Sequence, residues 1–354
     1  MATARPPHTS DRARHAMLAG FLVLVAAVLV FRLLAMGATA QAVMASTRQA
    51  PASSAASSSE SASSAPLTPE EQAAARAELT PGKAVVLGLV EGITEFLPIS
   101  STGHLLVAER ILDVGQHPST KSAADTYTIG IQIGAILAVV VLYFGRLRRM
   151  AEGVIGKDPG GRTSLVAVLI AFVPAAVVGF IGSQFIEKHL LSVWPVIAAW
   201  IIGAFVIFAF AKRFSSSTVG TALDAISVRQ AVIIGVAQCA ALWPGTSRSM
   251  VTILAALLVG LSLSAAIEFS FLLGLLTVSA ATAYGLLRHG GDLIDAYGVI
   301  NPLIGVVVAF ISAVVAVRWM VTYLQRHSLA IFGWYRLAVA ALAAGLVIAG
   351  VISA

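Results

Sequence analysis

Charged residues are scarce in this chain, and their scarcity excludes an ordinary soluble protein. Only 11% of the 354 residues are Asp, Glu, Lys or Arg, whereas a soluble domain carries about a quarter. Hydrophobic residues make up 58% of the chain, which is more than one soluble core can bury, so lipid must surround much of its surface. Cysteine is nearly absent, since Cys239 is the single one. This excludes a disulfide framework and a multi-cysteine metal site.

Long apolar runs predict an all-α polytopic membrane protein. A membrane-spanning helix needs about 20 mostly apolar residues. Runs close to this length lie at about 127–145, 163–183, 195–211, 265–287, 300–320 and 334–353. Two further apolar stretches, 82–112 and 229–260, are interrupted near the middle by Pro, Gly and hydroxyl residues. Irregular backbone at membrane depth is tolerated only inside protein or beside a watery cavity, so each stretch is predicted to be a re-entrant helical hairpin.

The basic residues predict how these segments are oriented. The net charge of +6 does not indicate nucleic acid, because the basic residues cluster in short loops between apolar runs, as in cytoplasmic loops. The residues that mark three cytoplasmic loops are Arg146, Arg148, Arg149, Lys157 and Arg162, then Lys212, Arg213 and Arg229, then Arg318, Arg326 and Arg336. Loops 184–194 and 288–299 contain one Lys or Arg each and are predicted to be external. The first hairpin then enters from outside and the second from inside, each followed by three spans, which makes an inverted-topology repeat.

A short sequence echo agrees with this repeat. Gly88–Glu91 resembles Gly235–Gln238, and Pro98–Ser101 resembles Pro244–Ser247. The echo places the two interruptions at equivalent positions of the two halves.

The chain is expected to divide into three regions. Residues 1–36 contain an apolar run of roughly 15 residues, which is short for a span, so this region is either an extra transmembrane helix or a signal peptide. Residues 37–80 form a Ser/Ala-rich external linker that cannot bury a core. The linker ends in a short polar surface helix that begins at Thr68 and Pro69. Residues 81–354 form the membrane domain.

The first interruption combines acids, hydroxyls and a histidine. Glu91 and Glu95 are four residues apart and share a helix face, where two carboxylates in an apolar stretch need a cation, a proton or a basic partner. Ser101 and His104 are three apart, so one helical turn can bring a hydroxyl beside an imidazole, as in a nucleophile and its base. The hydroxyl residues at the start of the second half-helix are Ser100, Ser101 and Thr102. A helix N-terminus of this kind attracts phosphate.

The second interruption supplies an arginine and more hydroxyls. Arg248 is predicted to lie deep in the membrane, where a charge normally has a partner, and its planar fork suits a phosphate. The hydroxyl residues around it are Thr246, Ser247 and Ser249.

Structural roles are the alternative for each of these features. The hydroxyls could cap helices, His104 could be a hydrogen-bonded bundle residue, and Glu91 with Glu95 could form a structural pair with the arginine. Glu268 is expected to complement a helix dipole, and Gln132 is expected to make an interhelical hydrogen bond. The functional interpretation depends on the co-occurrence of acids, histidine, hydroxyls and arginine at two facing breaks.

Residues 91–104 and 244–249 resemble the two motifs of the undecaprenyl-diphosphate phosphatase family, also called bacitracin-resistance proteins. Residues 131–137 and 268–273 also resemble this family, and the likeness covers about residues 82–354. The resemblance implies two re-entrant hairpins in an inverted repeat. It also implies hydrolysis of undecaprenyl diphosphate to undecaprenyl phosphate and phosphate at the external face of the bacterial cell membrane. That reaction recycles the carrier lipid for peptidoglycan synthesis and gives bacitracin resistance.

These observations assign a role to each candidate residue. Ser101 is expected to be the nucleophile and His104 its partner; in a competing scheme His104 is itself the nucleophile, and direct attack by water is a third. Arg248 is expected to bind the diphosphate. The hydroxyl residues expected to help it are Ser100, Thr102, Thr246, Ser247 and Ser249. Glu91 and Glu95 are expected to hold a divalent cation, Mg or Ca, that bridges to the substrate phosphates.

A transporter or lipid flippase is the rival function, because inverted repeats with broken helices are also transporter architecture. The favoured function predicts a polyprenyl diphosphate lipid as substrate and membrane lipids as partners. A homo-oligomer stays open at this point. Phosphate release would distinguish the enzyme from the transporter.

Overall fold

The computed structural model describes residues 69–211 and 220–353, and in these ranges the chain forms helices with short connections and no strand. A single parallel bridge joins Thr221 to Leu261. The predicted all-α polytopic fold is confirmed. The expected N-terminal helix or signal peptide and residues 37–68 of the Ser/Ala-rich linker lie outside the described residues.

Six of the described helices are long and apolar enough to cross a membrane, as the hydrophobic runs predict. These are α5 Pro118–Leu142, α7 Pro159–His189, α8 Val193–Ala211, α11 Leu263–Tyr297, α12 Ile300–Leu324 and α13 Ala330–Ile348. Local caps explain two of the starts. Asp158 accepts a hydrogen bond from the Gly161 amide at the start of α7, and Ser262 accepts one from the Ala265 amide at the start of α11. The predicted interhelical hydrogen bond of Gln132 is confirmed, since its Oε1 accepts from Thr282 Oγ1 at 2.9 Å.

The two interrupted stretches form broken helical hairpins. The first consists of α3 Pro81–Thr94 and α4 Ser101–Leu112; the second consists of α9 Val228–Gln238, the short 3₁₀ helix η2 Cys239–Leu242, and α10 Arg248–Leu258. In each hairpin the two helices contact each other. Ser100, just before α4, has φ 73° and ψ 104°, and Ser247, just before α10, has φ 75° and ψ 110°. Residues other than glycine rarely adopt this backbone conformation. Ser100 and Ser247 have nearly the same φ and ψ at equivalent positions of the two hairpins, which agrees with the sequence echo. The sides from which the hairpins enter stay predictions.

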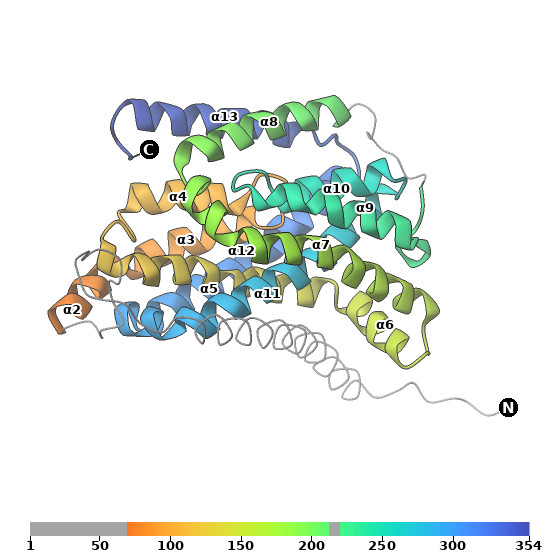
Figure 1. The fold of residues 1–354 in the computed structure, drawn as a ribbon, viewed down its shortest axis with the longest axis horizontal. Helices are drawn as coiled ribbons and strands as arrows, with labels where there is room; N and C mark the ends of the chain where they lie inside the picture. Colours follow the sequence, from red (N-terminus) through yellow and green to blue (C-terminus); the bar gives the residue numbers. More distant parts are fainter. Residues whose placement is uncertain (1–68, 212–219, 354) are drawn as a thin grey trace, which may run out of the picture.

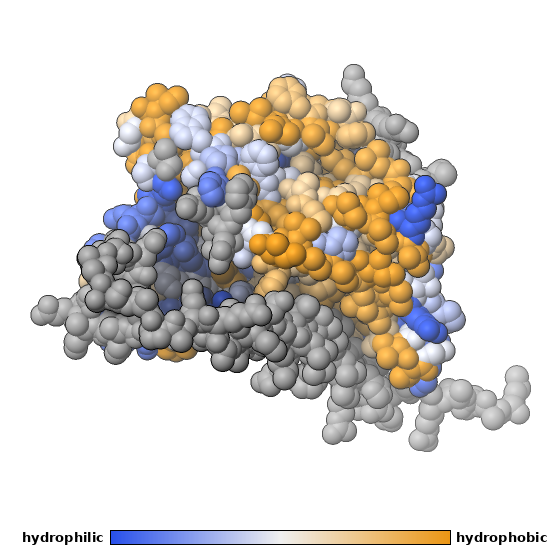
Figure 2. Space-filling view, in the orientation of Figure 1, coloured by the Kyte–Doolittle hydropathy of each residue, from blue (hydrophilic) through white to orange (hydrophobic). Residues whose placement is uncertain are grey.

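The helices are arranged as one elongated bundle with a pair along its edge. In Figure 1 the helices α3, α5, α7, α11 and α12 run along the long axis, while α8 and α13 lie together along the upper edge and contact each other. Figure 2 shows hydrophobic residues across the middle of the visible face and hydrophilic residues toward its two ends. Large apolar side chains such as Phe180, Ile181 and Phe205 are exposed, as expected where lipid is the solvent.

The short helix α2, Pro69–Glu78, begins at the proline that the sequence indicates. It does not simply lie at the surface, because Ala75 in the helix and Leu79 directly after it are fully buried. The side chain of Asn301 also donates to the Leu79 carbonyl at 2.6 Å. The apolar residues on one face of α2 therefore anchor it against the membrane domain.

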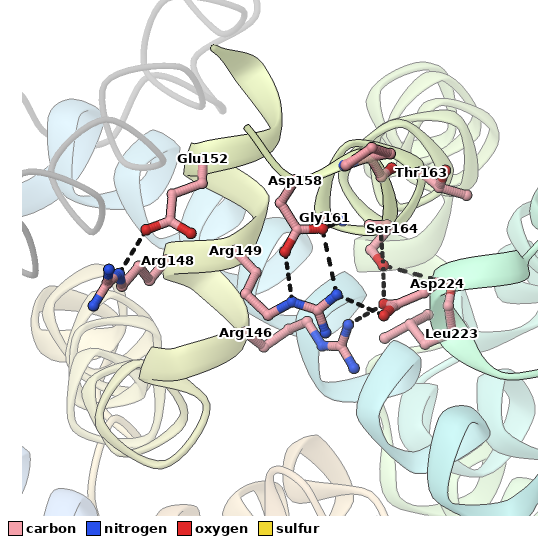
Figure 3. A network of polar contacts seen from close by, with 12 residues as sticks. Arg146, Arg148, Arg149, Glu152, Asp158, Gly161, Thr163, Ser164, Leu223 and Asp224 are labelled. Carbon is pink, nitrogen blue, oxygen red and sulfur yellow. Dashed lines mark hydrogen bonds and ion pairs between the residues drawn. The ribbon is translucent and has the colours of Figure 1, made fainter. Parts of the chain in front are cut away.

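A network of ion pairs ties helix ends together at one end of the bundle (Figure 3). Helix α6, Phe144–Val154, supplies Arg146 and Arg149. Arg146 forms a bidentate pair with Glu268, at 2.7 and 3.0 Å, and also pairs with Asp224. Arg149 bonds Asp158 and Asp224, each at 2.7 Å. Glu268 lies beyond the first turn of α11, so the expected role at the helix dipole is wrong, and its structural role is the ion pair with Arg146.

Candidate active site

An ion pair between Glu95 and Arg248 joins the two helix breaks. Arg248 Nη2 donates to Glu95 Oε1 at 2.8 Å, and the two side chains are only 13% and 8% exposed, respectively. The other arm of the fork donates to the Ser270 carbonyl at 3.2 Å, and the guanidinium lies 5.2 Å from the centroid of the Phe96 ring. A Cβ at Gly274 would overlap this guanidinium, so the glycine leaves it room. The predicted intramembrane arginine has the acidic partner that its burial requires.

Ser101 is hydrogen-bonded to the same carboxylate. Its hydroxyl donates to Glu95 Oε2, while Arg248 occupies Oε1 of that group. Glu95 therefore holds a hydroxyl on one oxygen and a guanidinium on the other. This arrangement suits a nucleophile, its base and a phosphate-binding cation.

The expected pair of Ser101 and His104 is not formed, because both ring nitrogens of His104 have other partners. Nδ1 lies 2.6 Å from the Ser100 carbonyl, which only accepts, so Nδ1 carries the proton. Nε2 then accepts from the Tyr335 hydroxyl at 3.0 Å. Helical side chains point back toward the N-terminus of their helix, which directs His104 to the carbonyl four residues earlier. The Ser101 hydroxyl is directed toward Glu95 instead.

Glu91 is the least satisfied polar group at the site. It is fully buried, and neither carboxylate oxygen has a hydrogen-bond partner. A buried carboxylate without a partner fits a bound cation or a proton. Among the described residues no group of three or more His, Cys, Asp or Glu side chains could hold a metal ion. The fit is therefore to an ion that takes few protein ligands, as Mg²⁺ does when substrate phosphates supply the others.

The hydroxyls of the second break bind the backbone of the first. Ser249 Oγ donates to the Leu97 carbonyl at 2.7 Å, and Ser247 Oγ, 3.1 Å from Ser249 Oγ, lies 3.4 Å from the same carbonyl. Both serines are buried, whereas Thr246 is half-buried and Thr102 is exposed. In the structure the two serines therefore connect the breaks, and Thr102 is the predicted phosphate-binding hydroxyl most open to its surroundings.

Three residues at the site were missed by sequence reasoning: Trp200, Tyr335 and Arg336. Trp200 Nε1 donates to the Ile99 carbonyl at 3.1 Å, and its ring lies 5.0 Å from that of His104. The ring of Tyr335 stacks on that of His104, with 5.6 Å between the ring centroids. Nothing in the sequence predicts that α8 and α13 lie beside the first break, so the sequence could not identify Trp200 and Tyr335 as residues of the site.

Arg336 corrects the sequence interpretation. Its charge predicts a position in a cytoplasmic loop, but it lies within α13 and is fully buried. The signal that identifies it is its isolation, since no other charged residue occurs from Ser328 to Ala354. A lone arginine within an apolar run marks a functional position in a membrane protein.

Comparison with known proteins agrees with the motifs at these breaks. The family described as "Bacitracin resistance protein BacA" matches residues 84–342. An undecaprenyl-diphosphatase of Sorangium cellulosum (strain So ce56) is 43% identical over 262 residues, which are 73% of this chain and 84% of that relative. An "Undecaprenyl-diphosphatase 2" of Rhodospirillum rubrum is 43% identical over 72% of this chain and 91% of its own length. An undecaprenyl-diphosphatase of Acinetobacter baumannii is 39% identical over 72% of this chain and 91% of its own length. With most of the membrane domain matched, the chain belongs to the BacA family of bacitracin resistance proteins.

Proposed function

We propose that this chain hydrolyses undecaprenyl diphosphate to undecaprenyl phosphate and inorganic phosphate. The names of the relatives supply the substrate. The observation that carries the proposal is the Ser101–Glu95–Arg248 constellation, which is formed from two broken helices in a largely apolar protein. A hydroxyl and a guanidinium at the N-termini of α4 and α10, with a carboxylate at the C-terminal end of α3 between them, have the chemistry for transfer of a phosphoryl group.

In the proposed reaction Ser101 attacks the terminal phosphorus. Its proton passes to Glu95, the new O–P bond forms, and the P–O bond to undecaprenyl phosphate breaks, so that the lipid monophosphate leaves with the electron pair. Water then attacks the phosphoserine, which releases phosphate and restores the hydroxyl. Arg248 stabilises the charge that develops on the phosphoryl oxygens.

His104 is the competing nucleophile in this proposal. Its Nε2 would have to leave Tyr335 before it attacked phosphorus, whereas the Ser101 hydroxyl already lies against a carboxylate. The geometry therefore favours Ser101. On this account His104 orders the break through the Ser100 carbonyl.

Glu91 is the residue proposed to hold Mg²⁺ or Ca²⁺, because Glu95, the other predicted ligand, already bonds Ser101 and Arg248 through its two oxygens. When bound, the ion would neutralise the charge of the diphosphate. Glu91 fits this role because its buried oxygens have no other partner. Exhaustive chelation is expected to abolish turnover, and added Mg²⁺ or Ca²⁺ is expected to restore it. Full activity after chelation would remove the metal from the proposal.

We place the reaction at the external face of the bacterial cell membrane, where it recycles the carrier lipid for peptidoglycan synthesis. The support is the charge bias of the loops, because the basic residues concentrate in the loop around 146–162 rather than at 184–194 or 288–299. The topology experiment in the Discussion tests this placement directly.

The test of the function is phosphate release by the purified protein in detergent micelles that contain undecaprenyl diphosphate. Ser101→Ala is expected to reduce kcat by about a hundredfold or more. Ser119→Ala is the matched control, since this serine is exposed at the start of α5 and lies outside both breaks, and it is expected to keep most of the activity. No release from the parent protein, with or without divalent cations, would reject the enzyme in favour of a transporter.

A further inference from the structure

We propose that Arg336 is a positioning residue that holds the two helix breaks in the arrangement needed for phosphoryl transfer. The proposal rests on the proposed function, and it concerns a residue that neither touches the candidate nucleophile nor pairs with the candidate carboxylates. Arg336 lies in α13, outside both hairpins.

The guanidinium of Arg336 binds backbone carbonyls from three separate parts of the chain. Its acceptors are Ala199 at 2.8 Å and Trp200 at 3.2 Å in α8, Pro98 at 3.4 Å in the first break, and Gly245 at 2.8 Å and Thr246 at 3.2 Å in the second. Its side chain is fully buried, and among the described residues no carboxylate forms an ion pair with it. A buried charge normally requires an opposite charge. Here no carboxylate in the described part of the chain supplies one, and the oxygens of five backbone carbonyls, which carry partial negative charge, stabilise the guanidinium instead.

Only an arginine fits this role. Its planar group presents five N–H donors in a fixed fork, which can bind acceptors on several sides at once. A lysine ammonium concentrates three donors on one atom and cannot bridge the same span. Gly203 in α8 is part of the arrangement, because a Cβ there would overlap the Arg336 guanidinium.

Holding these carbonyls also fixes the amides that follow them. In a trans peptide the C=O and the next N–H point in opposite directions. The hydrogen bond from Arg336 to the Thr246 carbonyl therefore orients the Ser247 N–H away from Arg336. Ser247 directly precedes Arg248, which pairs with Glu95. Ser247 has a backbone conformation that costs free energy, so its neighbours must hold it in place. At the first break, the bond to Pro98 lies two residues before Ser100, which has the same unusual φ.

The experiment compares Arg336→Lys and Arg336→Met with Arg318→Met, an exposed arginine on α12. Variants are first matched for melting temperature and monodispersity in detergent. For folded Arg336→Lys we expect kcat to fall about a hundredfold, as displacement of catalytic groups by about an ångström does. We expect the kcat of Arg318→Met to stay within about threefold of the parent value, because substitutions at exposed positions usually have small effects. Gly203→Ala, which displaces the guanidinium but keeps the charge, is the second variant if Arg336→Met does not fold.

Two further measurements separate positioning from a general loss of stability. In a double-mutant cycle, Arg336→Lys added to Arg248→Ala should cost little beyond Arg248→Ala alone, because both disturb one unit. Hydrogen–deuterium exchange of peptides covering 97–103 and 243–250 should accelerate about tenfold or more in Arg336→Lys, while peptides of α5 keep the parental rate.

The exchange readout does not depend on catalysis. An inactive parent with accelerated exchange in the variant would therefore reject the proposed function and leave the positioning role standing. Parental kcat in Arg336→Lys, or unchanged exchange at both breaks, would overturn the inference about Arg336.

Discussion

At the scale of single residues, the Glu95 carboxylate joins the candidate nucleophile Ser101 to the candidate phosphate-binding residue Arg248. The spacing of Glu91 and Glu95, and a lone Arg248 among hydroxyls, identified the groups that the structure brings together. The sequence did not reveal that Ser101 bonds Glu95 rather than His104. That choice depends on side-chain direction at the turn between two half-helices, which spacing along an ideal helix does not describe.

Arg248→Lys is predicted to reduce kcat/KM by about a hundredfold or more, as loss of one preorganised charge donor does. The guanidinium contacts Glu95 and the Ser270 carbonyl with different nitrogens. A lysine ammonium cannot reproduce both contacts and still bind a phosphate in a bidentate manner. Steady-state phosphate release with the purified variant measures the effect. Turnover close to that of the parent in Arg248→Lys or Arg248→Ala would contradict the phosphate-binding role.

At the scale of elements, hydrophobicity predicted which helices exist, while their lengths and packing needed the structure. The run at 265–287 predicts a span there, but α11 continues to Tyr297, beyond the purely apolar segment. The proline and glycine residues predicted both breaks. The unusual conformation of Ser100 and Ser247 was not predictable, because serine carries no signal for positive φ.

Ser100→Gly is predicted to stabilise the protein. Relief of the positive-φ conformation is worth about 1–3 kcal/mol and exceeds the added chain entropy of glycine, about 0.5–1 kcal/mol. The Ser100 side chain makes no capping hydrogen bond, so little is lost with it. Ser249→Gly is the matched control and should destabilise, since Ser249 is in a helix and its hydroxyl bonds Leu97. A lower melting temperature in Ser100→Gly than in the parent would show that the backbone there is not strained.

The ion-pair network is predicted to make stability depend on pH in the acidic range. Hydrogen bonding to Arg149 lowers the pKa of Asp158. For Asp224, burial acts to raise the pKa, but the bonds to Arg149 and Arg146 outweigh it and the pKa is lowered. A lowered folded-state pKa gives stability that is present above the unfolded value, about 3.9, and is lost as the pH falls through the folded value. The contribution of these two aspartates to the melting temperature in detergent should therefore be constant from neutral pH downward and fall once the pH drops below about 4.

Asp224→Asn provides the control for this pH dependence. It should lower the melting temperature at neutral pH, because both arginines lose a charged partner. It should also reduce the fall at acidic pH. An identical acid profile in the parent and the variant would exclude Asp224 as a source of the dependence.

At the scale of the whole molecule, the loop charges predict an orientation in which the first hairpin enters from outside. Arg336 no longer supports that orientation, since it is buried at the breaks rather than in a loop. The remaining evidence is the basic cluster of α6 and the loop that follows it, together with the basic residues at 212–229 and at 318–326. Charge counting failed at Arg336 because it cannot distinguish a loop arginine from one that binds backbone carbonyls inside the bundle.

Cysteine labelling of intact cells is predicted to show this orientation. With Cys239 first replaced, a cysteine at Ser119 should react with an impermeant thiol reagent. A cysteine at Lys157, which is exposed and outside the ion-pair network, should react only after permeabilisation. The reverse pattern would invert the topology and place the reaction inside the cell.

The central claim is that two broken helices meet to form one phosphatase site in which Ser101 is the nucleophile. The most direct test is acid quench of a single turnover with undecaprenyl diphosphate labelled at the terminal phosphate, followed by peptide mapping. Our account predicts acid-stable label on the peptide that contains Ser101, and no label in Ser101→Ala. Acid-labile label on His104, or an active Ser101→Ala enzyme, would contradict it.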